Sequence, residues 1–113
     1  YVNVQYNGAA VGLPDSGLTT DQFIYHYDYP GQPIVYMGHS NQLPEGKATV
    51  LTPNQVRALG DALEEIHSYF KKVYGTNPNK PYAMDTEFKF DQPLGSDSTA
   101  EPILMMKQCR PYY

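Results

Sequence analysis

The stretch from Thr52 to Gly75, TPNQVRALGDALEEIHSYFKKVYG, predicts one long amphipathic helix. Apolar side chains recur in it at three- and four-residue steps, which places them on one helical face; they are Val56, Leu59, Leu63, Ile66, Phe70 and Val73. Thr52 and Gln55 have the spacing of a capping box, and Pro53 suits the first helical position. Gly75 lies where a glycine commonly ends a helix. We therefore expect a helix from Pro53 to Val73 that packs one face against a sheet.

Two strands are predicted after this helix. Residues 84–90 alternate between apolar or hydroxyl side chains and charged ones, which is the period of a half-buried strand. Ile103 to Arg110 is predicted to be the last strand. Plain alternation places Gln108 and Arg110 on one face of it and Cys109 with Met105 on the core face. These strands, with those before the helix, predict a mostly antiparallel sheet of four to six strands.

The segment before the helix contains weaker strand signals and one turn signal. Phe23, Tyr25, Tyr27 and Tyr29 occupy alternate positions, which is typical of a strand. The predicted elements are, in order, a strand over Tyr1–Tyr6, a loop over Asn7–Thr20, a strand over Phe23–Tyr29, a type II turn over Tyr29–Gln32, a strand over Ile34–Met37 and a short strand over Lys47–Leu51.

Length and composition favour one α+β domain over residues 1–113. A net charge of −4 speaks against a nucleic-acid partner, because phosphate binding needs clustered Lys and Arg. No apolar run is long enough to predict a membrane span. The single cysteine, Cys109, excludes an internal disulfide and favours a cytoplasmic protein, with the periplasm left open. The first residue, Tyr1, and an end directly after a predicted strand indicate a piece of a longer protein.

The polar face of the last two predicted strands carries the residues with the clearest chemistry. It gathers Asp85, Glu87, Gln108 and Arg110. A carboxylate and an amide oxygen, as in Glu87 and Gln108, are hard ligands that suit Mg²⁺. The planar fork of Arg110 suits a phosphate. The alternative is a solvated hairpin face with a surface ion pair such as Glu87 with Arg110, which would contribute little stability.

Four segments, taken in order, resemble the nucleotide-binding domain of pyruvate phosphate dikinase and phosphoenolpyruvate synthase. Residues 84–88, MDTEF, are similar to the family's D-I-E-W segment, and residues 107–111, KQCRP, to its L-Q-A-R-P segment. Residues 51–59, LTPNQVRAL, resemble L-S-x-x-Q-V-x-x-L, and residues 16–23, SGLTTDQF, resemble S-G-x-x-T-P-D-x-Y. The departures are Phe88 for the tryptophan, Lys89 for a small residue, Cys109 for alanine, Thr20 for proline and a longer loop between the last two segments.

The resemblance implies an ATP-grasp fold, of which this chain would be the C-terminal subdomain. It implies that Glu87 and Gln108 ligate Mg²⁺, and that Glu87, Gln108 and Arg110 bind ATP, with Arg110 as the catalytic phosphate contact. The parent protein would then be an ATP-dependent phosphotransferase, and this piece alone would be inactive. Its implied partners are the N-terminal ATP-grasp subdomain and a phosphohistidine swivelling domain. The acceptor substrate is left open.

Two other functions remain open at this point. A degenerate, non-catalytic member of the family would act as a binding or scaffold module, which the departures from the family's segments favour. An unrelated α+β domain would recruit partners through its tyrosine-rich sheet. A structure in which the strands of Glu87 and Arg110 are not neighbours would favour this second alternative.

Overall fold

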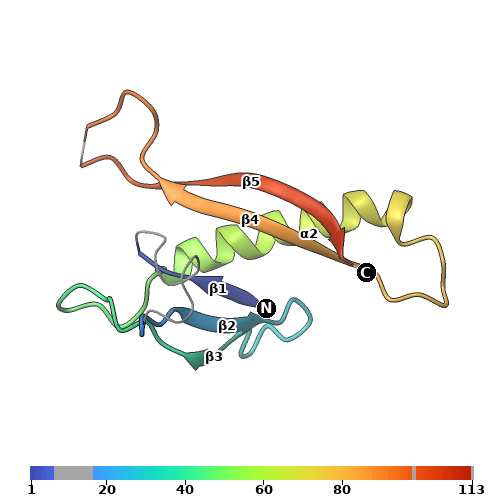
Figure 1. Ribbon diagram of the computed structural model, residues 1–113, viewed down its shortest axis with the longest axis horizontal. Helices are drawn as coiled ribbons and strands as arrows, with labels where there is room; N and C mark the ends of the chain where they lie inside the picture. Colours follow the sequence, from blue (N-terminus) through green and yellow to red (C-terminus); the bar gives the residue numbers. More distant parts are fainter. Residues whose placement is uncertain (7–16, 98, 113) are drawn as a thin grey trace. The chain divides into compact units, whose positions relative to one another are not determined.

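The computed structural model describes residues 1–6, 17–97 and 99–112, which belong to two compact units. Unit 1 is Tyr1–Val56 and unit 2 is Arg57–Tyr113. The predicted loop over residues 7–20 lies outside the described residues except for its last four. The elements, drawn in Figure 1, are β1 (Val2–Val4), β2 (Asp21–Tyr25), β3 (Ile34–Gly38), α2 (Pro53–Tyr74), β4 (Ala83–Asp91) and β5 (Ile103–Tyr112).

The predicted α+β class is confirmed, but the described strands do not form one sheet. A three-stranded antiparallel sheet has the order β1-β2-β3, and β4 pairs with β5 in a separate two-stranded sheet. The prediction of one sheet of four to six strands is therefore wrong for this part of the chain. Within the described residues, no helix has the length and apolar character needed to cross a membrane.

The hairpin of β2 and β3 differs from its predicted form in two respects. β2 ends at Tyr25, so the predicted continuation of the strand to Tyr29 is wrong. The Gln32 N–H donates to the Tyr29 carbonyl at 3.2 Å, which confirms a turn there. However, Gly31 does not have the positive φ that a type II turn requires at its third position. The proline before Gly31 is compatible with a type I turn, which needs no positive φ.

A buried carboxylate organises unit 1. Asp21, the first residue of β2, is 0% exposed. Its Oδ1 accepts the Ser40 N–H at 2.7 Å, and its Oδ2 accepts the Val50 N–H at 2.6 Å. Burial and then the charge of Asp21 raise the pKa of the Tyr36 phenol. Because a buried charge is costly unless it is hydrogen-bonded, these two bonds are needed for Asp21 to occupy its place.

The predicted strand over residues 47–51 is wrong, and Asp21 explains why. Side chains satisfy both backbone groups of Val50: its N–H donates to Asp21, and its carbonyl accepts the Tyr6 hydroxyl at 3.2 Å. A strand would need these groups for pairing with a neighbouring strand. Val50 and Leu51 are nevertheless buried and join Phe23 among the core side chains of unit 1.

Helix α2 confirms the predicted start and ends one residue later than predicted, at Tyr74. The capping box is present: the Gln55 N–H donates to Thr52 Oγ1 at 3.2 Å, and the Thr52 N–H donates to Gln55 Oε1 at 2.9 Å. The apolar stripe is buried at Val56 and Leu59 but 64% exposed at Val73. The predicted packing of the whole stripe is therefore wrong at its C-terminal end.

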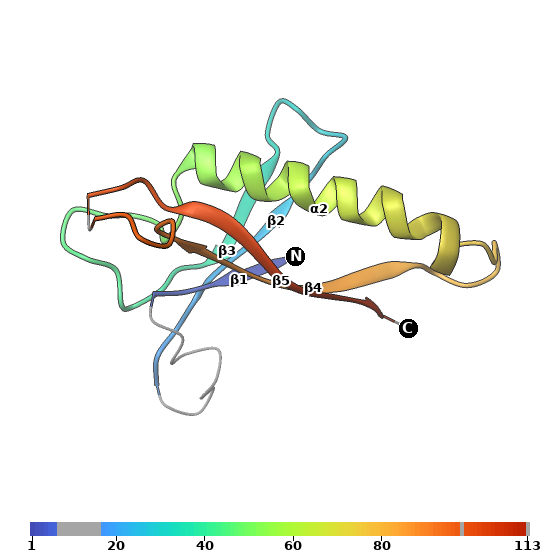
Figure 2. The ribbon, with the colours of Figure 1, turned by 90° about the horizontal axis from the view of Figure 1, so that it is seen from above.

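A loop joins the end of α2 to β4, as drawn in Figure 2. The Tyr82 hydroxyl donates to the His67 carbonyl at 2.9 Å, and the two rings lie 4.6 Å apart. Burial, followed by the nearby Tyr74, raises the pKa of the Tyr82 phenol. Gly75 follows the helix without a positive φ. A Cβ there would lie 2.8 Å from Lys71 Cγ and 3.1 Å from the Tyr82 ring, so close approach explains this glycine.

The capping box gives a first prediction. Thr52→Ala removes the acceptor of the Gln55 N–H, and we expect it to lower the free energy of unfolding by about 1 kcal/mol. Urea denaturation followed by circular dichroism measures the change. Thr76→Ala, in the exposed loop after the helix, is the matched control and should change stability by less than about 0.5 kcal/mol. Equal effects of the two substitutions would contradict the assigned cap.

The buried carboxylate gives a second prediction. Asp21→Asn replaces one acceptor oxygen by an NH₂ group, which then faces a backbone N–H. We expect a loss of about 2–4 kcal/mol in the free energy of unfolding, since a buried donor loses its charged partner. The same urea experiment measures it, with Asp28→Asn on the exposed β2–β3 turn as the control. A loss under about 1 kcal/mol would show that Asp21 does not hold these segments.

Candidate functional site

The β4–β5 hairpin brings together the four residues predicted to share a polar face. Asp85 pairs with Arg110, and Glu87 pairs with Gln108. Directly opposite residues in an antiparallel pair lie on the same face, and so do residues two apart on one strand. The strands of Glu87 and Arg110 are therefore neighbours. Strands that did not pair would have favoured the alternative of an unrelated domain.

The ion pair of Arg110 is with Asp85. Arg110 Nε donates to Asp85 Oδ2 at 3.0 Å, and both side chains are largely exposed, at 67% and 45%. The predicted alternative of a Glu87–Arg110 ion pair is therefore wrong, since the carboxylate directly across the ladder takes the guanidinium. Solvent screens such a pair, so its contribution to stability is small. Its main effect is to hold the arginine close to the hairpin surface.

Glu87 and Gln108 carry polar groups that the described part of the chain does not use. Neither side chain hydrogen-bonds or pairs with another described residue, and both are exposed. A carboxylate and an amide in cross-strand positions have Cβ atoms about 5 Å apart, so their oxygens can approach one small cation. This donor set fits Mg²⁺, which takes one or two protein oxygens and fills its other positions with water and phosphate.

A β-bulge in β5 sets which side chains join this face. The register shifts between Glu87 and Phe88, because Phe88 pairs with Met106 and leaves Lys107 as the extra residue. On the N-terminal side of the bulge the alternation is reversed, so Met105 lies opposite Lys89 on the polar face. The prediction that Met105 and Cys109 share the core face is wrong; Met106 takes the place of Met105.

The far end of the polar face holds a second ion pair. Lys89 Nζ lies 3.2 Å from Asp91 Oδ2, two residues along β4. The hydrogen bond from Lys89, followed by that from the Gln92 backbone N–H, lowers the pKa of Asp91. Lys89, which departs from the small residue of the resembled segment, therefore pairs within its own strand.

Sequence reasoning missed two features of this site. The first is the Asp85–Arg110 pair, which follows from the register of β4 against β5. The alternation of side chains along each strand does not give this register, so it leaves the partner of Arg110 undetermined. The bulge has no glycine or proline at Lys107 to indicate it. The one available signal was the apolar run over residues 103–106, which no single two-residue alternation fits.

The histidines add no metal centre to the described residues. His39 Nδ1 lies 3.7 Å from Asp21 Oδ1, and the His39 ring stacks on Tyr36 at 4.9 Å. The His67 ring packs against Tyr82 at a tilt of 33°, and His26 is exposed directly after β2. Across residues 1–6, 17–97 and 99–112, no three His, Cys, Asp or Glu side chains gather as a metal-binding group. A Mg²⁺ site here would therefore depend on a ligand's own oxygens.

Comparisons of the chain with protein-family models, with curated proteins and with solved structures found no match.

Proposed function

We propose that the polar face of the β4–β5 hairpin is one half of a Mg-ATP site in an ATP-dependent phosphotransferase of the pyruvate phosphate dikinase kind. The observation that carries the proposal is the shared face of Glu87, Gln108 and Arg110, fixed by the pairing of β4 with β5. The ordered resemblance of four segments supports it. The other half of the site would come from an N-terminal ATP-grasp subdomain.

Glu87 and Gln108 would hold the metal on this face. The two residues lie opposite each other on the ladder. The Glu87 carboxylate and the Gln108 amide oxygen make no hydrogen bond with another described residue. Bound Mg²⁺ would neutralise phosphate charge during transfer. Two protein oxygens are too few for a tight metal site by themselves, so metal and nucleotide should bind together.

Arg110 would contact the phosphate oxygens beside the metal. It lies two residues from Gln108 on the same face, and its side chain is 67% exposed. Its ion pair with Asp85 uses Nε, and within the described residues this is the one hydrogen bond that the guanidinium makes. The terminal guanidinium nitrogens suit a phosphate, which arginine binds through paired N–H groups.

The proposal predicts metal-dependent nucleotide binding. In a backbone NMR titration with a non-hydrolysable ATP analogue, we expect shifts at Glu87, Gln108 and Arg110 in the presence of Mg²⁺ and not in its absence. Arg110→Ala should weaken binding about tenfold or more, because a charge-assisted hydrogen bond is worth roughly 1.5–3 kcal/mol. Glu87→Ala removes a metal ligand, so we expect the Mg²⁺-dependent shifts to disappear.

Matched variants separate loss of the site from loss of the fold. Glu101→Ala removes an exposed glutamate just before β5 and should bind as the unmodified chain does. Asp85→Asn should change the free energy of unfolding by less than about 1 kcal/mol, since the broken pair is exposed. Shifts elsewhere, or equal shifts with and without metal, would contradict the proposal. If the protein joined to its N-terminal subdomain bound Mg-ATP equally well after Glu87→Ala and Arg110→Ala, the site assignment would be wrong.

A further inference from the structure

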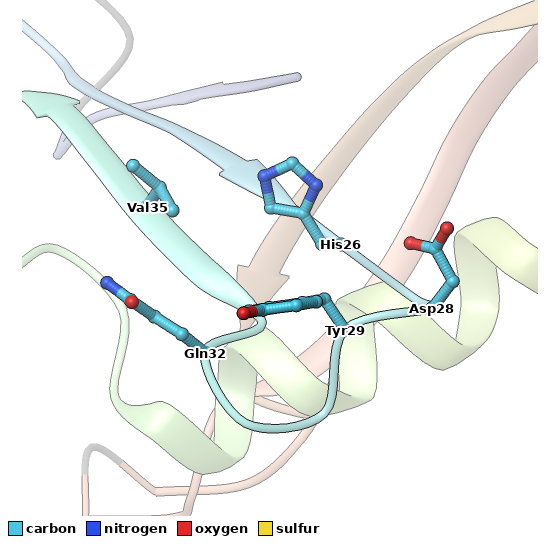
Figure 3. A pocket seen from close by; sticks show the side chains of 5 residues that line it. All are labelled: His26, Asp28, Tyr29, Gln32 and Val35. Atoms are coloured by element: carbon cyan, nitrogen blue, oxygen red, sulfur yellow. The ribbon is translucent and has the colours of Figure 1, made fainter.

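A hollow of about 420 Å³ lies at the turn that joins β2 to β3 in unit 1. Figure 3 shows its lining side chains, which are His26, Asp28, Tyr29, Gln32 and Val35. The hollow is open to solvent, since all five of these side chains are exposed. The hollow shares no residue with the polar face of β4 and β5.

Backbone hydrogen bonds hold the turn in shape without using the lining side chains. The His26 N–H donates to the Pro33 carbonyl at 2.7 Å and closes the hairpin end. The Tyr29 N–H donates to the His26 carbonyl at 3.4 Å, and the Gln32 N–H donates to the Tyr29 carbonyl at 3.2 Å. Two consecutive turns therefore fix the backbone from which the lining side chains project, which lowers the entropic cost of ordering this loop on binding.

The side chains around the hollow offer one ring face and several polar groups. Tyr29 is 63% exposed, and Figure 3 shows its ring extended toward Gln32, with His26 and Val35 apart from the ring. The Asp28 carboxylate, the Gln32 amide and the His26 imidazole make no hydrogen bond or ion pair with another described side chain. Together they provide both donors and acceptors next to an aromatic face.

We infer that this hollow binds a neutral sugar ring. The C–H face of a pyranose packs on an exposed aromatic ring, while planar carboxylate and amide groups bind pairs of neighbouring hydroxyls. Asp28 disfavours phosphate and other anionic ligands, because Lys and Arg are absent from the described lining. A cationic ligand would also satisfy Asp28, so the experiment must separate a sugar from a cation.

The test is a backbone NMR titration of the 113-residue chain with methyl β-D-glucoside, maltose and, separately, choline. We expect saturable shifts in residues 26–35 with a sugar at millimolar concentration. Tyr29→Ala should weaken binding about tenfold, since the stacking face is lost. Tyr1→Ala removes another highly exposed tyrosine, 73% exposed and outside the hollow, and should leave binding unchanged.

Asp28→Asn separates the two ligand classes. Sugar binding should weaken in this variant but remain saturable, because the amide keeps one acceptor oxygen and gains a donor. Binding of choline that exceeds that of both sugars and disappears in Asp28→Asn would overturn the inference. Absence of saturable sugar shifts in residues 26–35 would overturn it too, as would equal effects of Tyr29→Ala and Tyr1→Ala. The spread of amide shifts in each variant verifies that it is folded.

Discussion

The arrangement of unit 1 depends on the burial of one carboxylate. Asp21 is withdrawn from water, and a charge in that position must be compensated by hydrogen bonds. Its two oxygens bind backbone N–H groups that are ten residues apart, at Ser40 after β3 and at Val50 before α2. Those two segments have no sheet partners of their own among the described residues, and Asp21 replaces the partners that a sheet would supply. Because Val50 is fixed, the helix cap at Thr52 begins at a defined point.

In unit 2 the corresponding constraint is the register of β4 and β5. An antiparallel pair fixes which side chains share a face, and a shift of one residue would reverse every assignment. The bulge at Lys107 is such a shift, but it lies on the N-terminal side of Gln108 and Arg110. The pairs that form the candidate site are therefore aligned by the regular part of the ladder. Beyond the bulge the alternation of β5 is reversed, so the apolar side chains of Met105 and Ile103 lie on the polar face, opposite Lys89 and Asp91.

Local patterns predicted the elements with strong periodicity or specific capping chemistry. The helix, its capping box and the last two strands are confirmed, because the apolar stripe from Val56 to Val73 and the alternation over residues 84–90 each repeat their signal several times. The predicted continuation of the strand through Tyr27 to Tyr29 is wrong, because these tyrosines lie in a turn but have the two-residue spacing of a strand. The predicted strand over residues 47–51 is wrong for another reason. These residues are apolar enough for a strand, but the Val50 N–H donates to the distant Asp21 carboxylate instead of to a neighbouring strand. No local signal identifies a long-range side-chain contact of this kind.

The charges on the polar face indicate which ligands it can accept. Asp85, Glu87 and Asp91 contribute three carboxylates against two cations, Lys89 and Arg110, both of which are already paired. A bare triphosphate would meet net negative charge there, and Arg110 alone would not offset it. In the proposed site, a divalent cation between Glu87 and Gln108 would reverse the sign of the charge at the point where phosphate would bind. The residues that make this face a poor anion site without metal would make it a better one with metal, so metal dependence is the property that would distinguish the proposed nucleotide site from an ordinary charged hairpin.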